Sequence, residues 1–204
     1  MSAFLGPIHY WLYNKIQNQL DLVESISELA EEKWGISLKA KLQEQYGLAE
    51  RRPLEQVIEN DNIHGWLQQQ VSGAEYRLAL CVTEILKEDT ERLEVLKQVF
   101  RDAGKERGTA LGQELNVAEI YKGISDSWLD GMPCDHAYSV VEQTEDSITF
   151  KRNTCVHEPY WKAVDGSISD YYALRRAWLE GFLEIQKGTI NQLDEVTYRI
   201  GKGE

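Results

Sequence analysis

Residues 137–155, AYSVVEQTEDSITFKRNTC, are where the sequence changes from helical to strand periodicity. β-branched and aromatic side chains alternate here with polar ones, a pattern typical of half-buried strands. Glu145 and Asp146 lie at the centre of the segment, so we expect a β-hairpin that turns at these two residues. Because helical spacing precedes the hairpin, we predict an α+β protein with a helical N-terminal region followed by helices packed on a small antiparallel sheet.

Upstream of the hairpin, apolar residues at helical spacing predict long amphipathic helices over residues 4–27 and 63–85. The cluster Asn60-Asp61-Asn62 is expected to cap the second of these. Weaker patterns predict helices over about 28–45, after Pro53, after Thr90 and after Asn116. We place a domain boundary near residue 90, with a helical region over residues 1–90 and an α+β domain over residues 91–204.

Downstream of the hairpin, a helical pattern returns after Pro159 and continues through Phe182. Gly188 breaks this pattern, and the segment from Ile190 to Ile200 is expected to form one closing strand. This strand would add to the hairpin and complete the sheet.

Composition limits the partners that the protein can have. The chain has 204 residues, 42% of them hydrophobic, with 22 basic and 34 acidic residues and a formal net charge of -12. This acidic balance predicts no nucleic-acid or membrane partner, because both favour clustered Lys and Arg. No apolar run approaches the roughly 18 residues of a membrane span, and the N-terminal residues do not resemble a signal peptide. Three cysteines in such a chain indicate reduced thiols and a cytoplasmic location, and the sequence allows a homo-oligomer.

The end of the hairpin carries two Cys-x-His pairs, Cys134 with His136 and Cys155 with His157. In a hairpin that is symmetric about Glu145-Asp146, Cys134 would face His157, and His136 would face Cys155. All four side chains would then share one face of the sheet, and two thiols with two imidazoles can bind zinc. The alternatives are a thiol or imidazole that lines a small-molecule pocket, and a thiol packed under Tyr160 and Trp161.

The motif Ile-His-x-Trp-Leu occurs twice, at residues 8–12 and 63–67, each time at the start of an expected helix. Two boundary histidines that pack beside a Trp would explain the repeat. Alternatively, His9 and His64 face each other and bind a divalent metal or a ligand, with Cys134 as a further metal-ligand candidate.

Glycines recur every four residues at Gly104, Gly108 and Gly112. Each interior glycine costs a helix roughly 1 kcal/mol relative to alanine, so a close contact should offset the cost. We expect the stripe to pack on the hairpin sheet, with a bound ligand as the alternative. Arg107, within the stripe, could reach an anionic ligand.

The chain has none of the phosphate-binding, serine-hydrolase or zincin motifs that we sought, namely the P-loop, GxGxxG, GxSxG and HExxH. The segment LKQVFRDAGKERGTALG and the strand-end cysteine of SITFKRNTC resemble the L-2-amino-thiazoline-4-carboxylic acid hydrolase family. The resemblance covers about residues 93–201. It implies a vinyl-reductase-type small-molecule-binding fold, an activity that opens a thiazoline ring by hydrolysis, and a pocket at Cys155.

These observations predict a small-molecule-binding protein that hydrolyses a small cyclic C–N bond if it is an enzyme. Cys155 would be the nucleophile or a ligand-contacting thiol, with His157 or His136 as the general base. Tyr160, Trp161, Gly104, Gly108 and Arg107 are the ligand-binding candidates. The alternatives are a non-catalytic sensor domain, and a metalloprotein that uses His9, His64, His157 and cysteines to bind zinc or another divalent metal.

Overall fold

The computed structural model describes residues 5–58, 62–112 and 115–203. Its elements confirm the predicted α+β class: helices form the N-terminal region, and a four-stranded antiparallel sheet lies in the C-terminal half. The helices are α1 (Pro7–Trp34), α2 (Lys39–Tyr46), α3 (Leu54–Val57), α4 (Ile63–Leu86), α5 (Arg92–Ala110), α6 (Val117–Ser127), the 3-10 helix η1 (Pro133–Asp135), α7 (Glu158–Ala163) and α8 (Ile168–Ile185). The strands are β1 (Tyr138–Gln143), β2 (Ser147–Arg152), β3 (Gly188–Gln192) and β4 (Thr197–Lys202).

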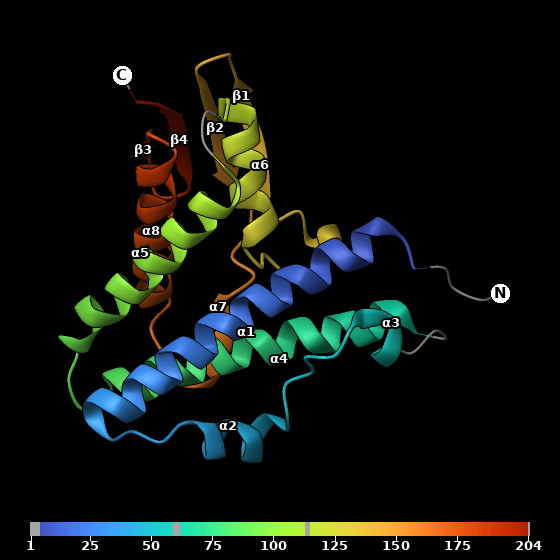
Figure 1. Ribbon diagram of the computed structural model, residues 1–204, viewed down its shortest axis with the longest axis vertical. Helices are drawn as coiled ribbons and strands as arrows, with labels where there is room; N and C mark the ends of the chain where they lie inside the picture. Colours follow the sequence, from blue (N-terminus) through green and yellow to red (C-terminus); the bar gives the residue numbers. More distant parts are fainter. Residues whose placement is uncertain (1–4, 59–61, 113–114, 204) are drawn as a thin grey trace.

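The two long N-terminal helices, α1 and α4, lie side by side, and the sheet with α5, α6 and α8 forms the other half of the molecule (Figure 1). Asn62 caps α4 as expected, since its side chain accepts from the backbone N–H of Gly65 at 3.0 Å. Asn60 and Asp61 of the predicted cap lie outside the described residues. Among the described helices, none is long and apolar enough to cross a bilayer.

The prediction of a separate helix over residues 28–45 is wrong, because α1 continues to Trp34. Nothing between the predicted break and Trp34 interrupts the helix, whereas Gly35 adopts a left-handed conformation with a φ of 67°. Its backbone N–H bonds back to the carbonyls of Ala30 and Glu31, which ends α1 there. The remaining residues of the predicted segment form the short helix α2.

A continuous hydrophobic core joins the two predicted regions. The larger buried cluster contains Leu78 and Ile85 of α4 together with Leu96 and Phe100 of α5, so it spans the boundary predicted near residue 90. A smaller cluster lies between the N-terminal parts of α1 and α4 and is closed by Leu129 and Met132, which follow α6. Packing thus connects the helical region to the segment that carries the candidate site.

The hairpin is present, but its register shifts within β1. Gln143 pairs with Ile148 and Glu142 with Thr149, as a symmetric turn requires, and then Val140 pairs with Phe150 because Val141 is bulged out. From this point facing residues are offset by one position. The offset moves the residues beyond the hairpin away from the partners that symmetric pairing predicts.

The single closing strand that we predicted is two strands, β3 and β4, which complete the sheet in the order β1-β2-β4-β3. The side chain of Asp194 makes the turn between them, because its Oδ1 accepts from the backbone N–H groups of Val196 and Thr197, both at 2.8 Å. The prediction of one strand over Ile190–Ile200 is therefore wrong, because Asp194 makes a turn within this strand-forming segment.

The glycine stripe of α5 packs against helix α8 and not against the sheet, which corrects our prediction. A Cβ on Gly104 would lie 2.1 Å from the carbonyl oxygen of Trp178, and one on Gly108 would lie 3.0 Å from that of Phe182. Gly181 makes the reciprocal contact, since its Cβ would lie 2.0 Å from the carbonyl oxygen of Arg101. The two backbones therefore touch, which leaves no space for a ligand at Gly104 or Gly108.

Candidate functional site

His157 lies directly before α7, and its ring is enclosed by acidic and phenolic groups from three other parts of the chain. Its side chain is 1% exposed. Its Nδ1 lies 3.0 Å from Oε2 of Glu75 on α4, and its Nε2 lies 3.4 Å from Oδ1 of Asp130. The hydroxyl of Tyr171 on α8 lies 2.9 Å from the same Nε2.

Arg175 completes this cluster from the next turn of α8. Its guanidinium donates two hydrogen bonds to Asp130, from Nη1 to Oδ1 and from Nη2 to Oδ2, the latter at 3.1 Å. It also donates from Nη1 to the Tyr171 hydroxyl at 3.2 Å, because residues four apart share a helix face. We call Glu75, Asp130, His157, Tyr171 and Arg175 the buried charge network. It contains two carboxylates and two cations.

The charges of the network fix the protonation of His157. Burial by itself would lower the pKa of His157, but the Glu75 and Asp130 carboxylates outweigh burial and raise this pKa to about 9. Burial would raise the pKa of Asp130, but Arg175 and His157 hold it well below its ordinary range. At neutral pH His157 is therefore an imidazolium that donates from both nitrogens. In this arrangement His157 cannot accept a proton as the general base that we expected.

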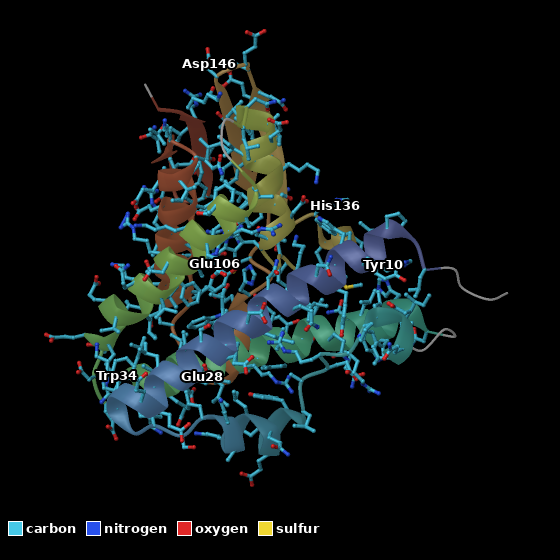
Figure 2. The ribbon with its side chains drawn as sticks, in the orientation of Figure 1. Tyr10, Glu28, Trp34, Glu106, His136 and Asp146 are labelled. Atoms are coloured by element: carbon cyan, nitrogen blue, oxygen red, sulfur yellow. The ribbon has the colours of Figure 1, made fainter. Side chains whose placement is uncertain are left out.

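Cys155 bonds to a tyrosine and not to an imidazole. Its half-buried thiol accepts a hydrogen bond from the hydroxyl of Tyr172 on α8 at 3.1 Å. His136, the other candidate base, is exposed at the end of η1 with a φ of 46° (Figure 2). No described hydrogen bond joins Cys155 to His136 or His157. The predicted pairing of a nucleophilic thiol with a histidine base is absent from the described geometry.

The four-residue zinc site predicted from hairpin symmetry does not form. Cys134 is exposed on η1, and the bulge at Val141 offsets the pairing on which the prediction rested. His157 lies in the buried charge network instead. Within the described residues, no group of three or more His, Cys, Asp or Glu side chains could hold a metal ion.

The three residues of the second metal hypothesis lie close together, but they do not form a metal site within the described residues. His9, His64 and Cys134 line one pocket of about 170 Å³ between the starts of α1 and α4 and η1. The remaining wall is apolar, and Nδ1 of His9 accepts a hydrogen bond from the backbone N–H of Gly6 at 2.9 Å. The pocket thus brings two imidazoles and one thiol together, and no group of metal ligands is found among the described residues.

Tyr160 and Trp161 pack around the buried charge network. The Tyr160 hydroxyl lies 3.1 Å from Oγ of Ser72, and its ring meets that of Tyr76 edge-on. Trp161 is 1% exposed, and its ring centroid lies 5.8 Å from that of Tyr171. Trp161 is therefore a core residue, while Tyr160 lines a pocket of about 260 Å³ at Glu75.

The largest cavity described, about 420 Å³, lies between α8 and the sheet. Its walls include the rings of Tyr138, Phe150, Tyr172 and Tyr198, and three arginines line it: Arg152, Arg175 and Arg176. We call it the sheet cavity. Tyr172 connects it to Cys155, whose thiol is not part of the wall. Arg175 connects it to the buried charge network.

The three arginines of the sheet cavity differ in how they are neutralised. Arg175 is paired with Asp130, and Arg176 donates to Glu180 at 2.8 Å. Arg152 has no carboxylate within ion-pair distance among the described residues, and its guanidinium lies over the Tyr172 ring, 4.1 Å from the centroid. Its Nη2 also donates to the backbone carbonyl of Glu195, another residue of the cavity wall, at 3.5 Å. Arg152 is therefore the arginine of this cavity whose charge no described carboxylate neutralises by an ion pair.

Sequence reasoning missed the residues that matter most here: Glu75, Asp130, Tyr171, Arg175 and Arg152. One signal was present, since Glu75 lies between Ala74 and Leu78 on the apolar stripe of α4. A charged side chain in such a stripe requires a buried partner. The partner could not be named from the sequence, because His157 is 82 residues away.

The chain was compared with protein-family models, curated proteins and solved structures, and none of them matches it.

Proposed function

We propose that the protein binds a small planar carboxylate in the sheet cavity. The observation that carries the proposal is Arg152, a cation without an acidic partner among the described residues, at the wall of a cavity with four aromatic rings. A guanidinium binds a carboxylate through two parallel hydrogen bonds, and aromatic walls favour a flat apolar body. The volume of about 420 Å³ suits a ligand of one or two rings.

The resemblance to thiazoline-carboxylate hydrolases independently suggests the same ligand class, because a thiazoline carboxylate is a small cyclic acid. Binding without catalysis is nevertheless the function that the contacts favour. His157 is held as an imidazolium by two carboxylates, and Cys155 lies behind Tyr172 and outside the cavity wall. A ligand in the sheet cavity would contact Tyr172 and the arginines, and neither Cys155 nor His157, the nucleophile and base candidates, lines the described wall.

The experiment uses benzoate as the probe, with benzyl alcohol as its uncharged counterpart, and measures binding by isothermal titration or by NMR. Arg152→Gln should weaken benzoate binding at least tenfold, or about 1.4 kcal/mol, because a charge-assisted bidentate contact is lost. Benzyl alcohol should bind the wild type weakly and lose little in the variant.

Arg199→Gln is the matched control. Arg199 lies on β4 of the same sheet, outside the cavity wall, and bonds to Thr149 and Glu142. The Arg199→Gln substitution removes the same charge from the protein as Arg152→Gln does, but at a place outside the cavity. The affinity of this variant for benzoate should therefore stay within about twofold of the wild-type value. Equal affinity of the Arg152→Gln variant and the wild type for benzoate, with both folded by circular dichroism, would refute the proposal.

A further inference from the structure

The wall of the sheet cavity carries two phenol hydroxyls, those of Tyr138 on β1 and Tyr198 on β4, that bond to no described residue. Both side chains are half-buried and line the cavity. Tyr172 differs, because its hydroxyl donates to Cys155 at 3.1 Å. Within the described part of the chain, the polar side-chain atoms that are both fully enclosed and unpaired do not include the hydroxyls of Tyr138 and Tyr198. These two hydroxyls therefore keep accessible surface that a molecule can reach.

The Tyr138 hydroxyl lies among the charged groups of the site. Burial raises its pKa to about 12, with Asp130 and Tyr198 adding to this effect and Arg175 and Arg152 opposing it. Tyr138 also pairs directly with Arg152 across β1 and β2, so the two side chains share one face of the sheet. At neutral pH the hydroxyl is therefore a protonated donor near the arginine that would bind the carboxylate.

Phe150 joins the two phenols into one aromatic wall. It lies on β2, between the strands that carry Tyr138 and Tyr198. Its ring centroid lies 6.1 Å from that of Tyr138 and 5.6 Å from that of Tyr198. A flat ligand that packs on Phe150 would thus have a phenol on each side.

The charges of the wall favour a single carboxylate on the ligand. Arg175 and Arg176 are each paired with a carboxylate of the protein, and Arg152 is not paired in this way among the described residues. Glu195, an exposed residue, also lines the cavity and adds a negative charge. A second carboxylate on the ligand would find no unpaired arginine and would be repelled by Glu195. The group that meets the two phenols should therefore be polar and uncharged.

We propose that the ligand of the sheet cavity is a hydroxy-substituted aromatic monocarboxylate, whose ring hydroxyl bonds to Tyr138 and Tyr198. This inference rests on the proposed function, in which Arg152 binds the carboxylate, and it adds the specificity of the site. A ligand hydroxyl can accept from one phenol and donate to the other. An unsubstituted ring would exclude solvent from both phenols and leave them unpaired, which lowers the affinity.

The experiment compares the affinities for benzoate, 3-hydroxybenzoate and 4-hydroxybenzoate by isothermal titration. The isomer whose hydroxyl reaches the phenols should bind about three- to tenfold more tightly than benzoate, as expected for one or two net hydrogen bonds. Tyr138→Phe and Tyr198→Phe should each reduce this ratio, and the double variant should bring it to about one. Benzoate affinity should not fall in these variants, because benzoate bonds to neither hydroxyl. Benzene-1,3-dicarboxylate should bind no more tightly than benzoate.

Two variants outside the sheet cavity are the controls. Tyr121 on α6 packs on Phe150 with 5.3 Å between ring centroids, and Tyr121→Phe removes the same hydroxyl group without changing the cavity wall. Arg107, the other arginine predicted to reach an anion, lines a separate cavity of about 280 Å³, where its Nε donates to Oγ of Ser127 at 2.9 Å. Tyr121→Phe and Arg107→Gln should both keep the wild-type ratio of hydroxybenzoate to benzoate affinity.

The outcomes separate this inference from the proposed function. Benzoate binding that does not depend on Arg152 would refute the proposed function and this inference with it. If benzoate binding requires Arg152 but both hydroxybenzoates bind no more tightly than benzoate, this inference alone is overturned. It is also overturned if the double variant of Tyr138 and Tyr198, folded by circular dichroism, keeps the wild-type ratio, or if Arg107→Gln abolishes the preference for the hydroxyl.

Discussion

Asp130→Asn tests how much the pairing of charges in the buried charge network contributes to the free energy of unfolding. Asp130 faces two cations, since it accepts two hydrogen bonds from Arg175 and one from His157. Asparagine keeps the shape of the side chain and removes its charge. The variant therefore leaves Arg175 and His157 buried with Glu75 as the only carboxylate of the network.

The magnitude follows from the distances. A pair of unit charges 3.1 Å apart, as for Arg175 Nη2 and Asp130 Oδ2, attracts by about 5 kcal/mol at an effective dielectric constant of about 20. The asparagine amide oxygen still accepts hydrogen bonds, which returns part of this energy. Removing one partner of a buried pair costs about 3–5 kcal/mol, and we expect a loss in this range. A typical domain has a stability of about 5–15 kcal/mol, so the loss should be large relative to the total.

The assay is urea unfolding followed by circular dichroism at neutral pH, with Asp21→Asn as the matched control. Asp21 pairs with Arg51 at 2.6 Å, but the two side chains are 66% and 36% exposed, so this loss should stay below about 1 kcal/mol. Adding Arg175→Met to Asp130→Asn should restore part of the stability, because the unpaired guanidinium is removed as well. A loss in Asp130→Asn no greater than that in Asp21→Asn would refute the reasoning.

Three further predictions concern titration, packing and thiol accessibility. The charged form of His157 stabilises the fold by ~3 kcal/mol below its unfolded pKa of 6.5, and this stabilisation should be lost as the pH rises through its folded pKa of about 9. The difference in free energy of unfolding between the wild type and His157→Gln should therefore shrink over that pH interval. A difference that stays constant with pH would contradict the prediction. Gly104→Ala should destabilise the protein by about 1–3 kcal/mol in thermal unfolding, because the new methyl group meets the backbone of α8. Gly73→Ala in α4 is the control, and it should change stability by less than about 1 kcal/mol, because its methyl group meets one side-chain atom, Nη1 of Arg77 at 3.0 Å, and no backbone atom. Equal effects would count against direct contact of the α5 and α8 backbones. Alkylation of the native protein by iodoacetamide, followed by mass spectrometry, should be fastest at the exposed thiol of Cys134 and slower at the half-buried thiol of Cys155. It should be slowest at Cys81, because burial raises the pKa of this thiol to about 11. Early modification of Cys81 would contradict this order.

Local signals predicted most of the fold, because they act within a few residues. The predicted caps at Asn62 and Asn116 each depend on a side chain that accepts from the backbone N–H three residues along the chain, and the structure has both. The turn at Asp194 was equally local but was hidden within a run of strand-forming residues. The end of α1 differs from the prediction because Gly35, whose left-handed conformation ends the helix, lies beyond the residues at which the apolar pattern weakens.

Register and long-range contacts could not be obtained in this way. A single bulged residue, Val141, changes every facing pair beyond it, and nothing in one sequence marks a bulge at this position. The glycine stripe indicated a close contact but did not identify its partner, because Gly181 lies far along the chain on α8. His157 was singled out for its spacing from Cys155, whereas its actual partners come from α4, α8 and the segment after α6.

The central claim, a carboxylate site at Arg152, is tested most directly by the position of a bound probe. A crystal of the protein with 4-bromobenzoate, measured at the bromine absorption edge, locates the bromine independently of the protein coordinates. We predict an anomalous peak among the rings of Tyr138, Phe150 and Tyr198, with the carboxylate in hydrogen-bond contact with the Arg152 guanidinium. A bromine peak outside the sheet cavity, or a carboxylate turned away from Arg152, would contradict the account.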